Sequence, residues 1–485
     1  MSARTERLQP LLLAVPFLVG IAVLKGLTVE IDTFHGSDAR VYQLPTILQL
    51  SERLDFSDYP SAQTPLYHVL TAWWGELVGF ELWKLRLLNV AFSYALALAL
   101  LRLLRRATAL APWQAFTLTL LVVLSPYVLG ASFTLLTDNL AILFAVLALE
   151  RIHAYSRTGS PAAFALACLA ICAALLTRQA FAWLVPVAAF FLLRRELGAR
   201  PALRDLAAVG RTAGGIALLG LAVVPLAALA LEWNGLVPPS ADPASCGLCD
   251  DRQGLARESF TLRTVGFTIA LAGLYGAAVF GPSLWRRLRM LRSPQLRAAR
   301  SALRSPGAQA LLGGPTARAL RASPAGRALE QAARGAARGV TPPSRRSLAL
   351  AATAGVALLL VSPLLYKPIR PGQSGDAGYL WKLSDRLPEL LGSSFAFWLL
   401  VPLGCVTLLT LIRRAGAGSL AAVYLAAFLL AALPIRLVYQ KYFDPFVLIA
   451  LALLARPGDL RTRADHLGVA VLLVAFVAYA FSFAG

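Results

Sequence analysis

The carboxylates between residues 29 and 84 are the first side chains in this sequence that could carry out chemistry. Asp32 and Asp38 follow the first apolar stretch directly, and Asp55 and Asp58 come later in the same segment. A carboxylate can take a proton from an attacking hydroxyl group, which is general-base catalysis. We predict Asp38 as this base and Asp32 as the second choice, although any single one of these acids is more often an ordinary loop residue.

Asp138 and Arg178 lie at the ends of two further apolar stretches. A guanidinium can hold a phosphate through two hydrogen bonds, so we predict that Arg178 stabilises a phosphate leaving group. The alternative is an arginine that reaches the lipid headgroups from a helix end. For Asp138 we predict a second catalytic or substrate-orienting acid. Its alternative is structural, because Thr137 or Asp138 could simply cap the helix that begins there.

Basic residues in two late segments predict an anionic partner. Outer loops of membrane proteins carry few Lys and Arg residues, so those found there call for a negative group. Lipid headgroups and a donor phosphate meet this need equally well, and both interpretations stay open. These residues are Lys367, Arg370, Lys382 and Arg386, near Asp376 and Tyr379, together with Arg436 and Lys441.

The histidines and cysteines give only weak metal signals. His35 and His68 could bind a metal with Asp38, but their wide separation is more typical of interfacial polar residues. Cys246 and Cys249 lack a second Cys or His pair, so a local disulfide or no role is favoured over zinc. We therefore predict no metal site and infer no cofactor, and leave open whether the chemistry needs a divalent cation.

The composition shows what must position these residues. Of 485 residues, 58% are hydrophobic and 15% are charged, whereas soluble chains average about 45–50% apolar and about 25% charged residues. The sequence therefore predicts an all-α integral membrane protein with about 11–13 transmembrane helices. The apolar stretches are 9–28, 85–104, 113–131, 138–152, 161–177, 180–193, 209–231, 264–284, 347–366, 387–412, 418–433, 443–456 and 467–484.

The distribution of charge predicts the orientation. Most of the 46 Lys and Arg residues fall at the N-terminus and in the loops on its side, and most of the 25 Asp and Glu residues fall in the others. Because cytoplasmic loops are basic, we predict a cytoplasmic N-terminus, an outer C-terminus and an extracytoplasmic active site in the plasma membrane. The net charge of +21 is thus a topology signal, and nucleic acid binding is not indicated.

Residues 286–346 separate two membrane modules. They include fourteen Arg residues and a single acid, Glu330, in a background rich in Ala, Gly, Ser and Pro, which cannot build a core. We predict a solvated cytoplasmic linker, with a short amphipathic helix on anionic lipid as the alternative. The predicted divisions are a catalytic membrane module at 1–231 with a first outer loop at 29–84, an outer loop at 232–263, a helix at 264–285, the basic segment 286–346, and a C-terminal membrane module at 347–485.

Several short motifs occur within roughly residues 10–200. They are the first-loop Asp, Thr64-Pro65-Leu66-Tyr67, Leu85-Arg86-Leu87-Leu88-Asn89, Leu136-Thr137-Asp138 and Thr177-Arg178-Gln179, with a late echo in Tyr439-Gln440-Lys441-Tyr442-Phe443. The first three resemble the GT-C superfamily of polytopic membrane glycosyltransferases, which carries short amphipathic helices in its first outer loop. The next two resemble, within that superfamily, the dolichyl-phosphate-glucose-dependent α-1,2-glucosyltransferase family and suggest a bacterial-type relative of it. That family tends to carry two adjacent acids in the first loop, whereas Ala39 follows Asp38 here.

The resemblance implies an inverting transfer of a sugar from a polyprenyl-phosphate donor to a hydroxyl acceptor at the extracytoplasmic face. The acceptor is a lipid-linked molecule, a glycan or a protein, and the bilayer is the other partner. A lipid-linked donor also agrees with the lack of a Gly-rich phosphate loop between a strand and a helix. The candidate catalytic acids are Asp38, Asp32 and Asp138, and the candidate substrate-binding residues are Arg178, Gln179, Thr64, Tyr67, Arg86, Lys367, Arg370, Arg436 and Lys441.

The main alternative function is a transporter or flippase of a lipid-linked or anionic solute. Transporters tend to show internal repeats and ionisable residues near the middle of the membrane. No obvious repeat occurs here, and the candidate polar residues gather at one face, which favours an enzyme. A third hypothesis is a membrane scaffold in which residues 286–346 bind acidic partners or lipid.

Overall fold

The computed structural model describes residues 3–26, 39–198, 206–238, 262–292, 344–364, 378–434 and 438–481. These residues form helices, apart from an antiparallel pair of two-residue strands, β1 (Glu389–Leu390) and β2 (Ser393–Ser394). The prediction of an all-α membrane protein is confirmed. Five described helices are long and apolar enough to cross a bilayer, or six if one bent pair counts as a single span. Four shorter apolar helices accompany them, and the predicted count of 11–13 included such short stretches.

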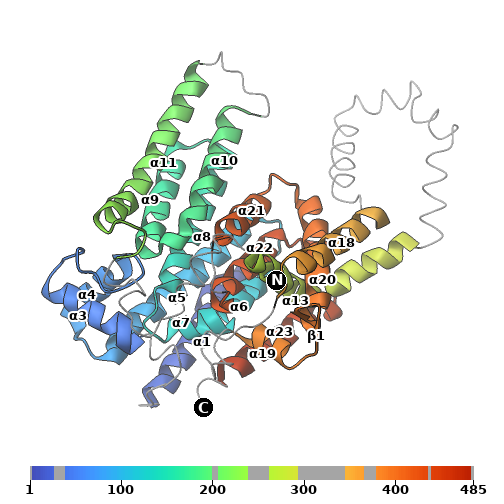
Figure 1. The fold of residues 1–485 in the computed structure, drawn as a ribbon, viewed down its shortest axis with the longest axis horizontal. Coiled ribbons are helices and arrows are strands. Elements are labelled where there is room, and N and C mark those ends of the chain that lie inside the picture. The colour runs from blue at the N-terminus through green and yellow to red at the C-terminus, as the bar shows by residue number, and fades with distance from the viewer. Residues whose placement is uncertain are drawn as a thin grey trace.

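The N-terminal half is built around α8, which packs against α5, α9 and α10. Ser160 caps α9 by accepting a hydrogen bond from the backbone N–H of Ala163, and Pro161 suits the first helical position. The short connection between α8 and α9 makes them an antiparallel hairpin (Figure 1). The helices of this half are α1 (Ala3–Gly26), α5 (Leu82–Ala107), α6 (Pro112–Val123), α7 (Pro126–Ser132), α8 (Asp138–Thr158), α9 (Pro161–Thr177), η2 (Gln179–Trp183), α10 (Leu184–Glu196) and α11 (Leu206–Glu232).

Short helices occupy the predicted first outer loop. They are η1 (Ala39–Gln43), α3 (Leu44–Glu52) and α4 (Leu66–Val78), and α3 and α4 lie beside the lower ends of α9 and α11 in Figure 1. On α3, Ile47 and Leu50 are buried while Leu48 is exposed, so the helix has an inner and an outer face.

The C-terminal half rests on close contact between α13 and α20. A Cβ atom on Gly273 would collide with the carbonyl oxygen of Leu400, and one on Gly404 would collide with that of Ile269. Small residues allow helix backbones in membrane proteins to approach each other in this way. The helices of this half are α13 (Arg263–Arg292), α18 (Arg345–Val361), α19 (Tyr379–Asp385), α20 (Phe395–Ala415), α21 (Leu420–Ala432), η4 (Gln440–Tyr442), α22 (Asp444–Leu454), η5 (Pro457–Asp459) and α23 (Arg463–Phe481).

The helices give the molecule two distinct ends. One cavity is surrounded by the C-terminal ends of α5, α8, α10, α20 and α22. We call the end of the molecule that holds this cavity the arginine end. Buried acids pair with arginines there, in Arg102–Glu150 at 2.9 Å, Arg414–Asp459 at 2.8 Å and Arg286–Asp465 at 2.6 Å.

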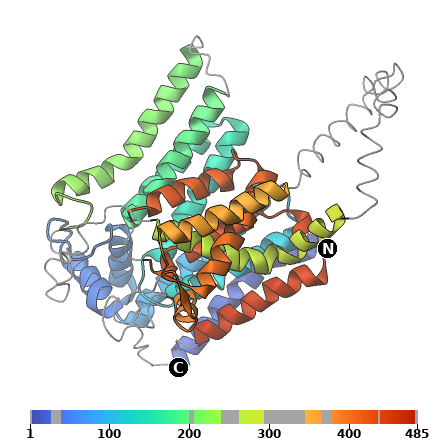
Figure 2. The same cartoon turned by 45° about the vertical axis from the view of Figure 1, so that its right-hand side comes forward.

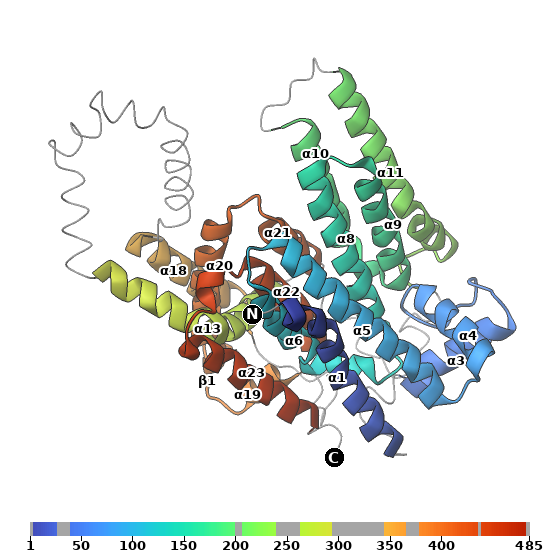
Figure 3. The same ribbon diagram turned by 180° about the vertical axis from the view of Figure 1, so that it is seen from behind.

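The start of α1 and the start of α23 also lie at the arginine end. Gln9 of α1 accepts a hydrogen bond from Arg105 of α5, and Asp465 of α23 pairs with Arg286 of α13. Both helices run from there in the same direction, so the start of α1 and the end of α23 lie apart (Figures 2 and 3). The opposite end, which we call the site end, holds the start of α8, the end of α9 and η4.

Candidate functional site

Asp138 and Arg178 form an ion pair at the site end. Arg178 has an extended backbone and ends α9, whereas Asp138 opens α8, so the hairpin of these two helices brings both side chains to one place. The side chain of Arg178 is only 12% exposed, and that of Asp138 is 17% exposed. Thr137 is the N-cap residue of α8, but its side chain makes no capping hydrogen bond and instead donates to Gln63 at 2.5 Å. Asp138 therefore holds an arginine, and the capping explanation does not apply.

Residues of the C-terminal half complete this cluster. The guanidinium of Arg178 lies over the ring of Tyr442, 5.1 Å from its centroid. The ammonium of Lys441 lies 5.3 Å from the same ring and 5.9 Å from that of Tyr439. Two cations thus flank one aromatic ring beside Asp138, which is a stable arrangement because aromatic faces attract cations. Burial disfavours the charge of Arg178, but Asp138 and Tyr442 outweigh this effect and raise its pKa.

A small cavity lies against this cluster. It has a volume of about 20 Å³, and its lining includes Asp138, Lys441 and Tyr127. That volume is close to the size of one water molecule. This cavity is therefore too small for a sugar or a phosphate, and either would have to displace the side chains that line it.

A larger and mostly apolar cavity lies nearby, between the first outer loop and α11. It measures about 580 Å³, and Leu66, Leu176, Pro225 and Leu229 are among its lining residues. Leu176 is two positions before Arg178 on α9. Asp55 of the first outer loop and Glu232 of α11 add carboxylates to the lining. The cavity thus reaches the last turn of α9, which carries Leu176.

Two of the predicted substrate-binding residues hold the first outer loop in place. The hydroxyl of Thr64 is buried and donates to the carbonyl of Leu175 at 2.7 Å. The amide of Gln179 donates to the carbonyls of Ala62 at 2.8 Å and Leu236 at 3.2 Å. These bonds connect the loop to α9 and to the segment after α11, and direct substrate contact by either residue stays a prediction.

Tyr67 and Arg86 present unsatisfied polar atoms. Among the residues that the structure describes, the buried hydroxyl of Tyr67 and the buried Nε of Arg86 have no hydrogen-bond partner, nor does Oδ1 of the neighbouring Asn89. Burial raises the pKa of Tyr67, and the charge of Asp138 acts in the same direction. Buried polar atoms without partners are uncommon in native proteins. The hydroxyl of Tyr67, which is close enough to Asp138 to interact with its charge, is a group that a polar ligand could satisfy.

His68 has a structural role. Its Nε2 donates to the side-chain oxygen of Gln43 at 2.6 Å, and its Nδ1 accepts from the hydroxyl of Tyr59 at 2.5 Å. Tyr59 in turn stacks on Trp233 with ring centroids 5.9 Å apart. Burial lowers the pKa of His68 to about 3, so the ring is neutral. Within the described ranges, no three His, Cys, Asp or Glu residues are grouped as a metal site would require.

Other predicted residues lie outside the described residues. These are the candidate bases Asp32 and Asp38, the basic residues Lys367, Arg370 and Arg436, and also His35, Asp376, Cys246 and Cys249. Most of the segment 286–346 lies outside them as well.

The structure adds a buried carboxylate that sequence reasoning missed. Asp444 is fully buried at the start of α22, and its Oδ1 accepts hydrogen bonds from Tyr379 at 3.0 Å, Gln440 at 3.1 Å and Tyr275. Its Oδ2 has no hydrogen-bond partner among the described residues. Tyr379 stacks on Tyr127, which lines the 20 Å³ cavity. The late motif, which we ended at Phe443, continues directly into this residue.

Comparisons with known proteins give one structural likeness. No family model matches the chain, and no curated protein matches it. Among solved structures, ArnT from Cupriavidus metallidurans in the apo state is similar, with 16% sequence identity and a TM-score of 0.35. The match covers 85% of this chain and 72% of that one. At this TM-score the backbones diverge over much of their length, so the likeness assigns neither a family nor an activity.

Proposed function

We propose that this protein is an integral membrane glycosyltransferase of the GT-C type. It would move a sugar from a polyprenyl-phosphate donor to a hydroxyl acceptor, with inversion at the anomeric carbon. The observation that carries this proposal is the convergence of Asp138, Arg178 and Lys441 beside the first outer loop. Arg178 and Lys441 are the fixed cations that a departing phosphate needs, and they are held in place before any ligand arrives.

The reaction assigns distinct tasks to these residues. As the acceptor oxygen attacks the anomeric carbon, its proton passes to a carboxylate, and the bond from that carbon to the phosphate oxygen breaks. Asp38 is our proposed base, with Asp32 second. Asp138 is already paired with Arg178, so its proposed task is to orient that guanidinium. The phosphate then takes the place of the Asp138 carboxylate as a partner of Arg178, or joins it.

The apolar cavity of about 580 Å³ is the proposed place for part of the polyprenyl chain. Leu66 and Leu176 in its lining adjoin the segments that carry Tyr67 and Arg178. A chain lying there would bring its phosphate to the cationic cluster without exposing isoprene units to water. The acceptor would reach the cluster from the side of the first outer loop.

The proposed site faces the outside of the cell. The helix ends that carry most of the arginines meet at the arginine end, and the candidate cluster lies at the opposite end. Loops and helix ends that are rich in Lys and Arg are retained on the cytoplasmic side of the membrane. The cluster is therefore expected on the extracytoplasmic side, where polyprenyl-phosphate sugars are used by enzymes of the family it resembles.

The test is sugar transfer in vesicles that contain the purified protein. A panel of radiolabelled polyprenyl-phosphate hexoses and pentoses serves as donor, with a membrane lipid extract as acceptor. We expect Arg178→Ala to lower kcat by about 10²- to 10³-fold, since a preorganised donor to developing charge has about this effect. Arg157→Ala is the matched control, because Arg157 is exposed at the far end of α8. Full activity of the Arg178→Ala and Asp38→Asn variants at normal expression would overturn the proposal, as would movement of the donor across the membrane without bond cleavage.

A further inference from the structure

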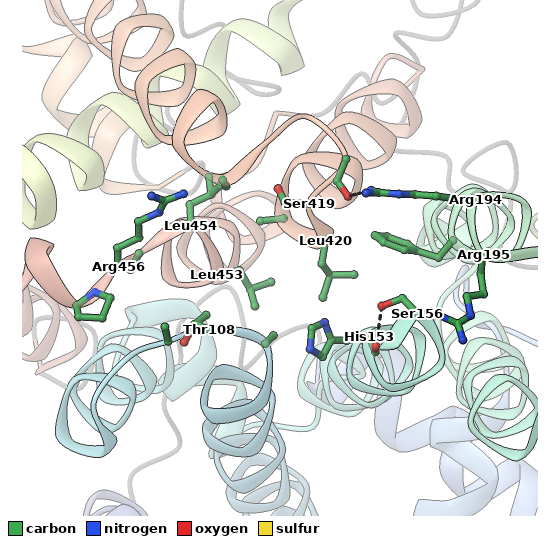
Figure 4. A pocket seen from close by; sticks show the side chains of 18 residues that line it. Thr108, His153, Ser156, Arg194, Arg195, Ser419, Leu420, Leu453, Leu454 and Arg456 are labelled. Atoms are coloured by element: carbon green, nitrogen blue, oxygen red, sulfur yellow. Dashed lines mark hydrogen bonds between the residues drawn. The ribbon is translucent and has the colours of Figure 1, made fainter. Parts of the chain in front are cut away.

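A second large cavity lies at the arginine end, far from the candidate site. It has a volume of about 760 Å³, and the described residues that line it come from the ends of six helices. Figure 4 shows Arg194, Arg195 and Arg456 around it, together with His153 and the hydroxyl residues Thr108, Ser156 and Ser419. Neither Asp nor Glu occurs among these lining residues. The cavity is therefore strongly positive.

One acid close to the cavity also has partners outside it. Glu196 follows Arg195 and interacts with its charge, and its carboxylate pairs with Arg211 at 2.6 Å and accepts a hydrogen bond from Tyr155 at 2.7 Å. Arg194 reaches across to the carbonyl of Gly418 just before α21 (Figure 4). Within the described ranges, this bond engages one of the five guanidinium N–H groups of Arg194.

The start of α21 adds further positive character. Ser419 is its N-cap residue, and its hydroxyl accepts from the backbone N–H of Ala422 at 3.4 Å. Leu420 and Ala421 also line the cavity, and N–H groups in the first turn of a helix have no acceptor within that helix. A helix N-terminus of this kind attracts anions. Here it lies beside two arginines of α10, so the two features act on one space.

Arginines at a helix C-terminus also have a simpler explanation, since they offset the negative end of the helix dipole. Arg413, in the last turn of α20, does so while exposed and outside the cavity lining. Dipole compensation thus needs no cavity, and it does not explain why arginines of α10 and the N-cap arginine of η5, Arg456, line one cavity. Apolar residues such as Phe191 and Leu453 line the same space, so an amphipathic ligand would fit it.

We propose that this cavity binds a phosphate-bearing anion. Its arginines supply bidentate donors for phosphate oxygens, and the first turn of α21 supplies backbone donors. The phosphate can belong to the headgroup of an anionic lipid or to a soluble compound such as a nucleoside diphosphate. The site is separate from the proposed transfer site and does not depend on that function.

The experiment measures binding to the full-length protein in nanodiscs. One arm compares native mass spectra after addition of phosphatidylglycerol or phosphatidylcholine, and the other titrates inorganic phosphate and a nucleoside diphosphate by calorimetry. We expect the Arg194→Gln/Arg195→Gln double variant to bind the preferred probe at least about tenfold more weakly than the wild type. The Arg413→Gln control, which removes a charge from the same end, should stay within about twofold.

Each result decides between the sources of phosphate or against the site. Selective loss of phosphatidylglycerol binding assigns a lipid headgroup, and selective loss of soluble phosphate binding assigns a soluble ligand. If the wild type binds none of these probes, or if Arg413→Gln weakens binding as much as the double variant does, the proposal is wrong. A further variant, Arg194→Lys/Arg195→Lys, keeps the positive charge and controls for misfolding of the Gln variant. Its affinity should lie between those of the wild type and the Arg194→Gln/Arg195→Gln variant, because lysine cannot form the bidentate contact.

Discussion

A buried guanidinium needs compensating charge, and at Arg178 this requirement explains the local structure. Its side chain is only 12% exposed, and its compensation comes from Asp138 and the ring of Tyr442. Removing one partner of a buried ion pair leaves the other charge uncompensated, at a cost of about 3–5 kcal/mol. A phosphate is one of the few ligands that could replace Asp138 without such a loss. The pair is therefore a support for the fold and a preformed position for an anion.

If Asp138 works by orienting Arg178, the two residues must be energetically coupled. We expect Asp138→Asn to lower kcat for sugar transfer by about tenfold or more in the wild-type background. In the Arg178→Ala background the same change should have an effect of less than about threefold, because the group that it orients is gone. The measurement is a double-mutant cycle on kcat. Additive effects would show that Asp138 acts independently, as a catalytic acid in its own right.

His68 predicts how stability depends on pH. Its pKa is lowered from 6.5 to about 3 by burial, so the unfolded chain binds a proton below pH 6.5 that the folded chain does not bind. The stabilising effect of neutral His68 is complete above pH 6.5 and is lost as the pH falls towards 3. We expect the free energy of unfolding to fall by about 2 kcal/mol between pH 7 and pH 5 from this group, at about 1.4 kcal/mol per pH unit below 6.5.

Thermal unfolding in detergent at pH 5, 6 and 7 checks this expectation. The His68→Gln variant should be less stable at pH 7, since Tyr59 and Gln43 lose their matched partner. Its stability should change less with pH than that of the wild type. An equal pH dependence in the two proteins would mean that the pKa of His68 is the same in the folded and unfolded states, which contradicts the lowering by burial.

At the scale of elements, the α8–α9 hairpin shows what could be predicted from the sequence. Apolar stretches at 138–152 and 161–177 were expected, and helices begin at Asp138 and end at Thr177. An antiparallel pair of helices with a two-residue connection brings its first and last residues together. Asp138 and Arg178 were each identified from the sequence, although their ion pair was not. Lys441 was predicted to bind substrate together with Arg178, but the contact of both with the ring of Tyr442 was not predictable, because it depends on how the C-terminal half packs against the N-terminal half.

Two other misses have local causes. Asp444 opens a strongly apolar helix, and a single acid at the end of an apolar stretch gives no sign of the tyrosines that will surround it. Those tyrosines come from α13 and α19, which are distant in the sequence. The role of His68 was open for a similar reason, since its partners Gln43 and Tyr59 lie on different segments of the first outer loop.

The close contact of α13 and α20 predicts the effect of a single methyl group. In Gly404→Ala the new Cβ would meet the backbone carbonyl of Ile269, so the helices must separate. We expect a loss of about 1–3 kcal/mol in the free energy of unfolding, which is typical of overpacking. Gly214→Ala on α11 is the control, because nothing lies within 4 Å of its added Cβ. That change should be neutral or stabilising, since alanine favours a helix by about 1 kcal/mol over glycine. Equal unfolding temperatures for the two variants would contradict the packing argument.

For the whole molecule, the decisive property is that its two ends differ in chemistry. The arginine end has buried acid–arginine pairs and a positive cavity, whereas the site end has the partly buried Asp138–Arg178 pair and an apolar cavity. The charge pattern of the sequence implies the same separation. A protein with this polarity has one orientation in a membrane under the positive-inside rule, and the proposed reaction depends on it.

Cysteine labelling in intact cells tests this orientation. Leu77 on α4 is 80% exposed at the site end, and Arg413 is exposed at the arginine end. In a variant without the native cysteines, Leu77→Cys should react with a membrane-impermeant maleimide in intact cells, and Arg413→Cys only after permeabilisation. The reverse pattern would place Asp138 and Arg178 in the cytoplasm. Extracytoplasmic sugar transfer at this site would then be excluded.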